Sequence, residues 1–486
     1  MRLPAASLLF SIILCAQPYQ PKIPKFWDDH EVEKFEVPLA NPQYSPRHMR
    51  SEDYYKLKVL PIYKTYPVYG PGREPAGYRE WLKQQEPEIV FDPSKLKTKE
   101  DWIAAGKLVF ESDPTIRPAP EQGEFFSSPL PPNPDGSRIF FLPGARYIIR
   151  KKGVLEIGFN SCANCHTRVM PDGSLVAGAQ GMFDFPTTPE QLERARNRTA
   201  EEFRRNLESR WTLFGAPWIE SKESFMSRVT PELALEMLRA RRSGVLARQG
   251  TSPFSPPHIP SLIGIEQRRY LDATGFARHR NMGDLARYAI TNQGLDTVAH
   301  FGDFQPSKDG TAFSMEKGTR YSDEQLYALA LYIYSLKPPV NPNKPSDLSR
   351  HGENVFKRQA CAGCHPPPLY TNNKLTPARG FKVPVELRKT DAILDVSVGT
   401  DPTLTLTTRR GTGFYKVPSL LGLWYRNAYG HGGWVDTLDD WFNPARLLPD
   451  FQPQNNLPKG AIPGHEFGLS LNPGDKAALI AFLKTL

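Results

Sequence analysis

Residues 160–169 have the sequence NSCANCHTRV, in which Cys162, Cys165 and His166 form a C-x-x-C-H motif. This spacing is typical of haem c attachment, in which both thiols bond to the porphyrin and the histidine binds one face of the iron. The motif leaves the opposite face of the iron undetermined. A second side chain could bind there, or the face could stay open to a small molecule. The motif therefore predicts a haem site whose distal ligand must be sought elsewhere in the chain.

The cysteine count extends this prediction to two haems. The sequence has five cysteines, and Cys15 lies in an apolar run near the N-terminus. The other four fall in two C-x-x-C-H motifs, CANCH and CAGCH, and the second supplies Cys361, Cys364 and His365. Together they predict two covalently attached haem c groups and leave no cysteine for a disulfide. For either motif alone, a redox-active or zinc-binding cysteine pair is the alternative.

The N-terminal stretch MRLPAASLLFSIILCAQPYQP has one arginine and a short apolar run, followed by polar, proline-rich sequence. The run is too short to span a bilayer and is typical of a cleaved secretory signal. We therefore expect residues 1–16 to be a signal peptide, the mature protein to be periplasmic or secreted, and no transmembrane span. Leu14 is bulky where lipid-anchor sites carry a small residue, which argues against lipid attachment at Cys15.

The composition predicts a mainly α, loop-rich protein. The 486 residues include 48 prolines, so most helices should be short and separated by extended segments. The formal net charge is +9, but the basic residues are interspersed with acidic ones along the chain. No basic cluster is interleaved with aromatic residues, so we expect no nucleic-acid partner.

The two halves of the chain repeat the same landmarks in the same order. The first half contains GKLVF, CANCH, IPSLIGI, SMEKG and YSDEQLYALALYIYSL, and the second contains GENVF, CAGCH, VPSLLGL, GHEFG and LNPGDKAALIAFLKTL. In the last pair, Ser322 aligns with Asn472 as a helix N-cap, and Gln325 aligns with Asp475 three residues on. This repetition predicts two cytochrome c-like haem domains related by internal duplication.

The repeat also predicts the domain organisation, with helical and small β insertions in the first domain. We expect a signal peptide (1–16), a Pro/Tyr-rich N-terminal arm (17–98), a first cytochrome c domain (99–337) with insertions at 111–161 and 186–250, a proline-rich linker (338–347) and a second cytochrome c domain (348–486). In the first insertion, ARYIIRKKGVLEIGF alternates apolar and polar residues and predicts a hairpin.

The distal ligands are sought in the loop before each final helix, where small cytochromes c place them. In the second half this loop contains His465, with His431 as the alternative, and no methionine occurs after residue 351. The corresponding residue of the first half is Met315. If Met315 binds the first iron, that haem is a six-coordinate electron carrier; if it packs in the core, the iron is open to peroxide or dioxygen. The sequence leaves both alternatives open.

Two segments carry a resemblance to a known superfamily. YKVPSLLGLWYRNAYGHGGWVDTLDDWF resembles the P-S/T-L-R-N … P-Y-x-H-D-G … T-L segment of the di-haem cytochrome c peroxidase superfamily, which includes MauG-type proteins. IPSLIGIEQRRYLDATG is similar to the matching first-half segment, so the resemblance runs from about residue 100 to the end. The chain departs from the peroxidases at Leu271, Ala428, Gly432 and Ala445.

These departures favour a branch that resembles the di-haem rubber oxygenases, in which GHEFG before the last helix is a familiar feature. The resemblance implies that His465 is the second ligand of a bis-histidine, electron-carrying second haem on His365. It also implies that the first haem, on His166, binds dioxygen. Calcium occurs between the haems of the peroxidases, but no side-chain ligand set for it stands out in this sequence.

From these observations we expect an oxidoreductase with peroxidase-like or oxygen-activating chemistry at the first haem and electron transfer through the second. A pure electron-transfer cytochrome and a haem dioxygenase acting on an apolar substrate are the alternatives. The expected partners are a small redox protein or a quinol-linked chain, with peroxide or dioxygen as the small molecule. His258 and His279 are the nearest candidates to move protons, and a structural role is the alternative for each.

Overall fold

The computed structural model describes most of the chain after the N-terminal stretch. The described residues are 19–69, 74–119, 141–158, 160–181, 199–209, 211–230, 232–233, 244–307, 318–454 and 458–486. The predicted signal peptide and Met315 lie outside these ranges. Among the described helices, none has the length and apolar character needed to cross a membrane.

Two long helices form the core of the first half. They are α4 (Lys99–Glu111) and α12 (Asp323–Ser335), and each starts in a capping box. At their crossing, a side chain on Gly106 would overlap the carbonyl oxygen of Ala328 and come within 2.8 Å of Cβ of Tyr332. Glycine at this position therefore lets the two helix backbones approach closely.

The second half contains a helix pair with the same close approach. It consists of α13 (Asp347–Arg358) and α17 (Pro473–Lys484). A side chain on Gly352 would overlap the carbonyl oxygen of Ala478 and come within 2.8 Å of Cβ of Phe482. The crossing of α13 and α17 thus has the same local geometry as that of α4 and α12.

The predicted helix caps are confirmed. The Ser322 side chain accepts a hydrogen bond from the backbone N–H of Gln325 at the start of α12. The Asn472 side chain accepts one from the backbone N–H of Asp475 at the start of α17. Both caps satisfy N–H groups that have no partner within the helix.

The N-terminal arm contributes to the core of the first half instead of only covering its surface. Trp27 and Phe35 of the arm are fully buried in the cluster that includes α4 and α12. Strand β1 of the arm pairs in parallel with β10, just before α12. The arm contains α1 (Asp29–Phe35), α2 (Ser51–Lys56), β1 (Lys58–Val59), β2 (Thr65–Tyr69) and α3 (Tyr78–Lys83), and β10 spans Thr319–Arg320.

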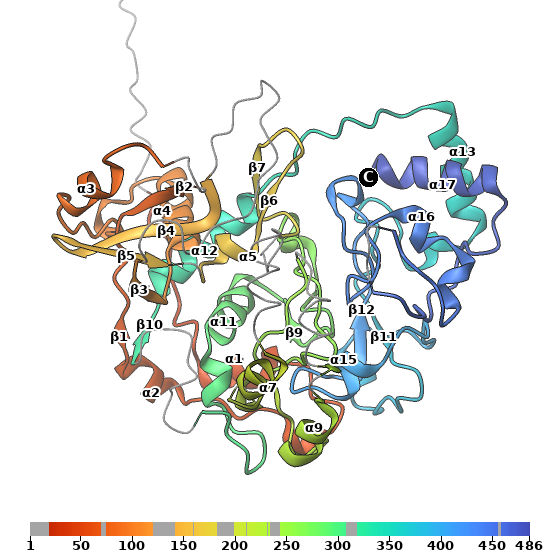
Figure 1. Ribbon diagram of the computed structural model, residues 1–486, viewed down its shortest axis with the longest axis horizontal. Coiled ribbons are helices and arrows are strands. Elements are labelled where there is room, and N and C mark those ends of the chain that lie inside the picture. Colours follow the sequence, from red (N-terminus) through yellow and green to blue (C-terminus); the bar gives the residue numbers. More distant parts are fainter. Residues whose placement is uncertain are drawn as a thin grey trace, which may run out of the picture.

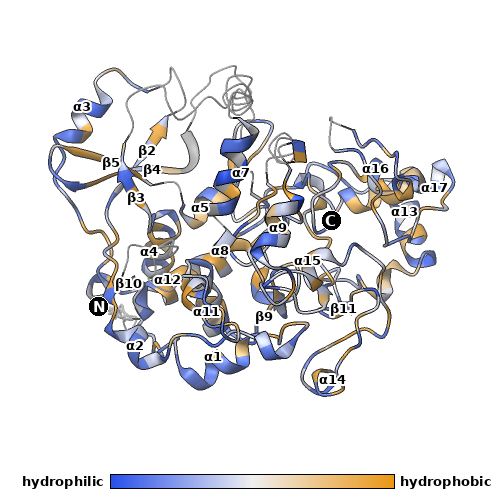
Figure 2. Ribbon diagram, turned by 60° about the horizontal axis from the view of Figure 1, so that its bottom comes forward, coloured by the Kyte–Doolittle hydropathy of each residue, from blue (hydrophilic) through white to orange (hydrophobic). Residues whose placement is uncertain are grey.

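A small antiparallel sheet joins the arm to the first insertion. Its strand order is β2-β4-β5-β3, and the new strands are β3 (Ile116–Pro118), β4 (Phe141–Lys151) and β5 (Val154–Gly158). Tyr147 pairs with Ile157 across β4 and β5, so the hairpin predicted in this insertion is confirmed. Figure 2 shows β2 in the hydrophobic colour, while α3 at the edge of the molecule is mostly hydrophilic.

The rest of the first half consists of short elements around the first C-x-x-C-H motif. A short helix holds the two cysteines, and a small hairpin of β6 and β7 follows it directly. The elements are α5 (Cys162–Cys165), β6 (Thr167–Val169), β7 (Leu175–Ala177), α7 (Ala200–Ser209), α8 (Trp211–Phe214), α9 (Lys222–Arg228), η3 (Ile265–Gln267), β8 (Tyr270–Leu271), β9 (Ala277–Arg278) and α11 (Met282–Asn292). Residues 186–198 and 234–243 of the predicted insertion at 186–250 lie outside the described residues.

In the second half, short elements and loops lie between α13 and α17 in the sequence. They are η5 (Cys361–Gly363), β11 (Leu375–Pro377), α14 (Leu387–Thr390), α15 (Thr403–Leu406), β12 (Phe414–Lys416), η6 (Leu423–Tyr425) and α16 (Leu438–Trp441). In Figure 1 the chain leaves α12 as an extended segment and reaches α13 on the other side of the molecule. The described chain is therefore mainly helical and loop-rich, with only small sheets, as the composition predicts.

Candidate functional site

The clearest candidate site lies between His365 and His465 in the second half. The centroids of the two imidazole rings are 6.4 Å apart, and the ring planes are inclined by 56°. An imidazole nitrogen binds a metal at about 2 Å, with the ring centre roughly 1 Å behind it. Two imidazoles on opposite faces of one metal ion therefore have centroids about 6 Å apart. The spacing of His365 and His465 fits a single metal ion held between them.

His365 is held in the orientation that a metal ligand needs. Its Nδ1 lies 3.0 Å from the carbonyl oxygen of Tyr370, so Nδ1 carries the proton and the lone pair of Nε2 is free to bind a metal. Burial lowers the pKa of His365, while the carbonyl groups of Tyr370 and Pro418 raise it by a smaller amount. The ring is thus neutral at pH 7, which is the form that binds metals.

His465 sits on a strained loop just before α17. Its φ angle is 48°, in the left-handed region, and its backbone N–H donates to the carbonyl of Val398 at 2.6 Å. Burial, with a smaller contribution from the neighbouring His365, lowers its pKa to about 4. Its Nδ1 is buried and has no hydrogen-bond partner among the described residues. A buried, unpaired imidazole on a strained backbone is costly, which is typical of a functional position.

Arg446 holds the His465 loop in place. It is fully buried, and its guanidinium donates to the carbonyl oxygens of Ile462 at 2.5 Å and of Gly464 and His465 at 2.8 Å each. Its Nε donates to the carbonyl of Trp441 at 2.8 Å, and the guanidinium lies 4.8 Å from the centre of the Trp441 ring. This residue cannot be predicted from the sequence, because a single arginine carries no pattern that marks it as buried.

The first motif arranges its histidine in a comparable way. Nδ1 of His166 lies 3.1 Å from the carbonyl oxygen of Pro260, so the lone pair of Nε2 is free to bind a metal. Burial lowers the pKa of His166 to about 4, against a smaller opposing effect of the Pro260 carbonyl. The helix that holds the motif is capped by the Ser161 side chain, which accepts from the backbone N–H of Asn164.

The two motif histidines differ in what faces them. His365 has the His465 ring opposite, whereas no ring contact joins His166 to another histidine in the part of the chain that the structure describes. Met315, the predicted alternative ligand of the first iron, lies outside the described residues. The described residues therefore bring two histidine rings together in the second half, whereas His166 has no such ring contact among them.

None of the four motif cysteines forms a disulfide. Burial raises the pKa of Cys162 and Cys361 to about 11 and that of Cys165 to about 12, and it also raises the pKa of Cys364. Redox-active cysteine pairs need a lowered thiol pKa, so these pairs lack the electrostatics of a thiol-disulfide catalyst.

The other histidines named by the sequence analysis have structural contacts. Nδ1 and Nε2 of His279 are both hydrogen-bonded, to the Arg268 carbonyl and to the Tyr334 hydroxyl, each at 2.7 Å. His431 stacks on Tyr415 with centroids 4.3 Å apart, and its Nε2 lies 3.1 Å from the carbonyl of Asp401. Both ring nitrogens of His279 and Nε2 of His431 are therefore engaged by oxygen atoms of the protein, and His431 stays the alternative to His465.

His258 is hydrogen-bonded to the second half, close in sequence to Pro260. Its backbone N–H donates to the carbonyl of His431 at 2.9 Å, and its Nδ1 lies 2.7 Å from the carbonyl of Gly430. Pro260, two residues further on, binds Nδ1 of His166. His258 therefore connects the two halves next to the loop that binds His166.

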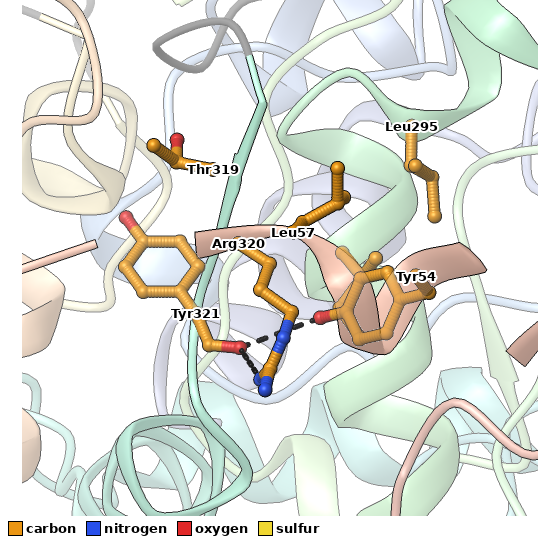
Figure 3. A pocket seen from close by; sticks show the side chains of 7 residues that line it. Tyr54, Leu57, Leu295, Thr319, Arg320 and Tyr321 are labelled. Carbon is orange, nitrogen blue, oxygen red and sulfur yellow. Dashed lines mark hydrogen bonds between the residues drawn. The ribbon is translucent and has the colours of Figure 1, made fainter. Parts of the chain in front are cut away.

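Within the described ranges, no three side chains of His, Cys, Asp and Glu gather closely enough to hold a metal ion by themselves. The enclosed cavity beside α2 is also too small for a substrate. Its volume is about 10 Å³, the room of one water molecule. Figure 3 shows Tyr54, Arg320 and Tyr321 around it, where Tyr54 and Arg320 both donate hydrogen bonds to the Tyr321 carbonyl. This cavity lies where the arm packs against β10.

Comparisons with known proteins give only distant similarities. No family model and no curated protein sequence matches the chain. Hydrazine synthase of Kuenenia stuttgartiensis is similar with 15% identity and a TM-score of 0.29, over 60% of this chain and 88% of that one. A MauG-like protein associated with microbial copper homeostasis is similar with 15% identity and a TM-score of 0.30, over 62% of this chain and 90% of that one. At these values neither similarity establishes a shared fold or function.

Proposed function

We propose that the chain is an exported di-haem c-type cytochrome with oxidoreductase activity. The observation that carries the proposal is the pair His365 and His465, whose rings are separated by the width of one metal ion and its two ligand bonds. His365 belongs to one of the two C-x-x-C-H motifs. Because these motifs use all the cysteines after residue 15, the simplest ion for the site is the iron of a covalently attached haem.

In this proposal each motif attaches one haem c and binds its iron through the motif histidine. Cys162 and Cys165 hold the first haem, with His166 as its ligand. Bound haem iron carries single electrons when six-coordinate, and it can also bind peroxide or dioxygen when one axial position is open. The residues around His365 are arranged for the first role, since both axial ligands are at hand.

The first half is the proposed site of peroxide or dioxygen chemistry. Its motif histidine is oriented by Pro260, and the described residues bring no second histidine to face it. The alternative, a pure electron-transfer cytochrome, requires Met315 to bind the first iron. Neither His258 nor His279 supports proton transfer on the open face, because hydrogen bonds to carbonyl groups or to Tyr334 engage them elsewhere.

The second haem is the proposed contact for a redox partner. Phe467 is 47% exposed, and its ring centre lies 5.4 Å from that of His465. The His465 ligand is thus one side chain away from the surface. A small redox protein or a quinol-linked chain in the periplasm or outside the cell would exchange electrons there.

The experiment that tests the proposal is to count covalent haem. The full chain is produced in a host that matures c-type cytochromes, and haem is measured by intact mass and by the pyridine haemochrome spectrum. We expect two haems in the wild type, and one in each of the double variants Cys162→Ser/Cys165→Ser and Cys361→Ser/Cys364→Ser. The control Cys15→Ser should retain both. A wild-type mass equal to that of the polypeptide alone would contradict the proposal.

A further inference from the structure

Four basic side chains lie where the two halves meet, three of them close enough to repel one another and Arg168 bonded to the residue after Arg426, and we refer to them as the interface cations. They are Arg168 and Arg268 of the first half, and Lys416 and Arg426 of the second. All four are half-buried. Arg168 reaches the second half directly, since its Nη1 donates to Oδ1 of Asn427 at 2.9 Å.

Two of the interface cations occupy equivalent positions in the sequence repeat. Arg268 lies eight positions after Pro260 (260 to 268), and Arg426 lies eight after Pro418 (418 to 426). Each directly follows a 3-10 helix, η3 or η6, that starts after a left-handed glycine. The repeat therefore brings one arginine from each half to the interface.

Both arginines belong to loops that hold a motif histidine. The carbonyl of Pro260 binds Nδ1 of His166. In the second half, the backbone N–H of Leu420 donates to the carbonyl of Tyr370 at 3.1 Å, the same carbonyl that binds Nδ1 of His365. Each arginine thus lies at the end of a loop that runs along the proximal side of a haem site.

The interface cations have no acidic partner among the described residues. Nε of Arg268 donates to the carbonyl of Gly264 at 3.3 Å, and Arg426 donates to the carbonyls of Ser419 at 3.1 Å and Leu421 at 2.5 Å. These acceptors are neutral. Nε of Arg426 is buried without any partner.

The nearest carboxylate does not neutralise the cluster. Asp272 already forms ion pairs with Arg248 at 2.5 Å and with Arg410 at 3.1 Å. Burial lowers the pKa of Lys416 to about 8, since the attraction of Asp272 is opposed by the repulsion of Arg268 and Arg426. Positive charges removed from water without a counter-charge destabilise a protein, so the loaded protein needs an anion here.

We propose that the interface cations form one shared binding site for the carboxylate side chains of both haems. The inference rests on the proposed function, since each haem c carries two propionate carboxylates. Arginine is suited to this ligand, because its planar fork donates two parallel hydrogen bonds to a carboxylate. A shared site would make the two haems interdependent, because one set of cations would bind carboxylates of both.

The test compares single and double variants of the holoprotein. Arg268→Gln and Arg426→Gln each remove one interface cation, and Arg268→Lys and Arg426→Lys keep the charge. Arg269→Gln, an exposed neighbour, is the matched control. The measurements are covalent haem per chain, the midpoint potential of each haem, and the propionate bands in redox-difference infrared spectra. Infrared spectra and calorimetry with added phosphate or acetate show whether the interface cations bind a free anion instead of the haem carboxylates.

We expect two haems in every single variant. Each glutamine variant should lower the midpoint potentials of both haems and shift the propionate bands, because a lost positive charge favours ferric iron. The lysine variants should stay near the wild type. Midpoint potentials and propionate bands of the glutamine variants that equal those of Arg269→Gln would overturn the inference. It would also be overturned if the double glutamine variant abolished the binding of phosphate or acetate without a change in the propionate bands. A wild type with two haems and unchanged variants would leave the proposed function intact, whereas a wild type without haem would overturn both.

Discussion

At the scale of single residues, the central feature is the contact between Arg446 and the loop that presents His465. Four carbonyl oxygens accept hydrogen bonds from this one guanidinium, and those of Gly464 and His465 belong to the loop itself. Hydrogen bonds to a charged donor are each worth about 1.5–3 kcal/mol. A left-handed backbone at His465 costs about 1–3 kcal/mol, so the contacts of Arg446 offset that strain.

We expect Arg446→Gln to loosen His465 from the second iron. The loss of a charged hydrogen bond should accelerate cyanide binding at the second haem by about 10-fold or more, and a high-spin absorption band should appear. Arg446→Lys, which keeps the charge but not the fork, should have an intermediate effect. The exposed Arg388→Gln is the control. Unchanged cyanide kinetics in Arg446→Gln would show that the loop holds His465 without this arginine.

The sequence predicted the residues of the site that follow a spacing rule. Cys162, Cys165 and His166 follow from a fixed motif, and His465 follows from its position before the final helix. Buried arginines could not be predicted in the same way, because a lone arginine is usually a solvated side chain. The exceptions are Arg268 and Arg426, because each follows the proline of its repeat by eight positions in the sequence.

At the scale of helices, the two crossing pairs are the strongest structural support for the predicted duplication. Phe110 and Tyr332 have ring centroids 5.2 Å apart with planes inclined by 58°. Phe356 and Phe482, at the matching positions, are 5.3 Å apart with planes inclined by 60°. The two halves thus repeat a close glycine contact and the aromatic pair beside it. The duplication and its domain boundaries stay predictions, which this correspondence supports.

Alanine at either crossing glycine should separate a helix pair. Because the new methyl group would overlap the carbonyl oxygen of Ala328 or Ala478, we expect Gly106→Ala and Gly352→Ala each to destabilise the protein by about 1–3 kcal/mol. Thermal unfolding of the holoprotein measures the effect. Gly474→Ala in the first turn of α17 is the control, since its methyl group meets only ordinary contacts and favours the helix. Equal melting temperatures for all three variants would argue against the close crossings.

Helix caps and the hairpin were predictable because they depend on neighbouring residues. The Ser322 cap is predicted from Gln325 three positions later. The β4–β5 hairpin is predicted from the alternation of apolar and polar residues. The arm was harder, since β2 pairs with β4 about eighty positions away (66 with 147). Such long-range pairing is decided by tertiary packing, which local sequence does not reveal.

At the scale of the whole molecule, buried ion pairs join parts of the chain that are far apart in sequence. Arg278 of β9 donates to both carboxylate oxygens of Asp391 in the second half, at 2.8 and 2.7 Å. The same guanidinium donates to the carbonyls of Lys34 and Glu36 in the arm. One side chain therefore connects the arm, the first half and the second half.

This ion pair should make stability depend on acid pH. Burial raises the pKa of Asp391, but the hydrogen bonds and charge of Arg278 lower it more, so the folded pKa lies below the usual value. The stabilisation is then present above the unfolded pKa of about 3.9 and is lost as pH falls through the folded value. Asp391→Asn should cost about 3–5 kcal/mol at pH 7, since it leaves a buried charge unpaired. Below about pH 4 the variant should lose less stability than the wild type; parallel pH profiles in denaturant unfolding would contradict this.

We propose that the second iron has His365 and His465 as ligands, whereas the first iron has only His166. The most direct test is the electron paramagnetic resonance spectrum of the purified ferric protein, recorded with and without cyanide, in the wild type and in His465→Ala. We predict one low-spin haem that does not bind cyanide and one high-spin haem that does. In His465→Ala, the low-spin signal should be replaced by a high-spin signal. Two low-spin haems that both ignore cyanide, or a low-spin signal that His465→Ala leaves unchanged, would contradict the claim.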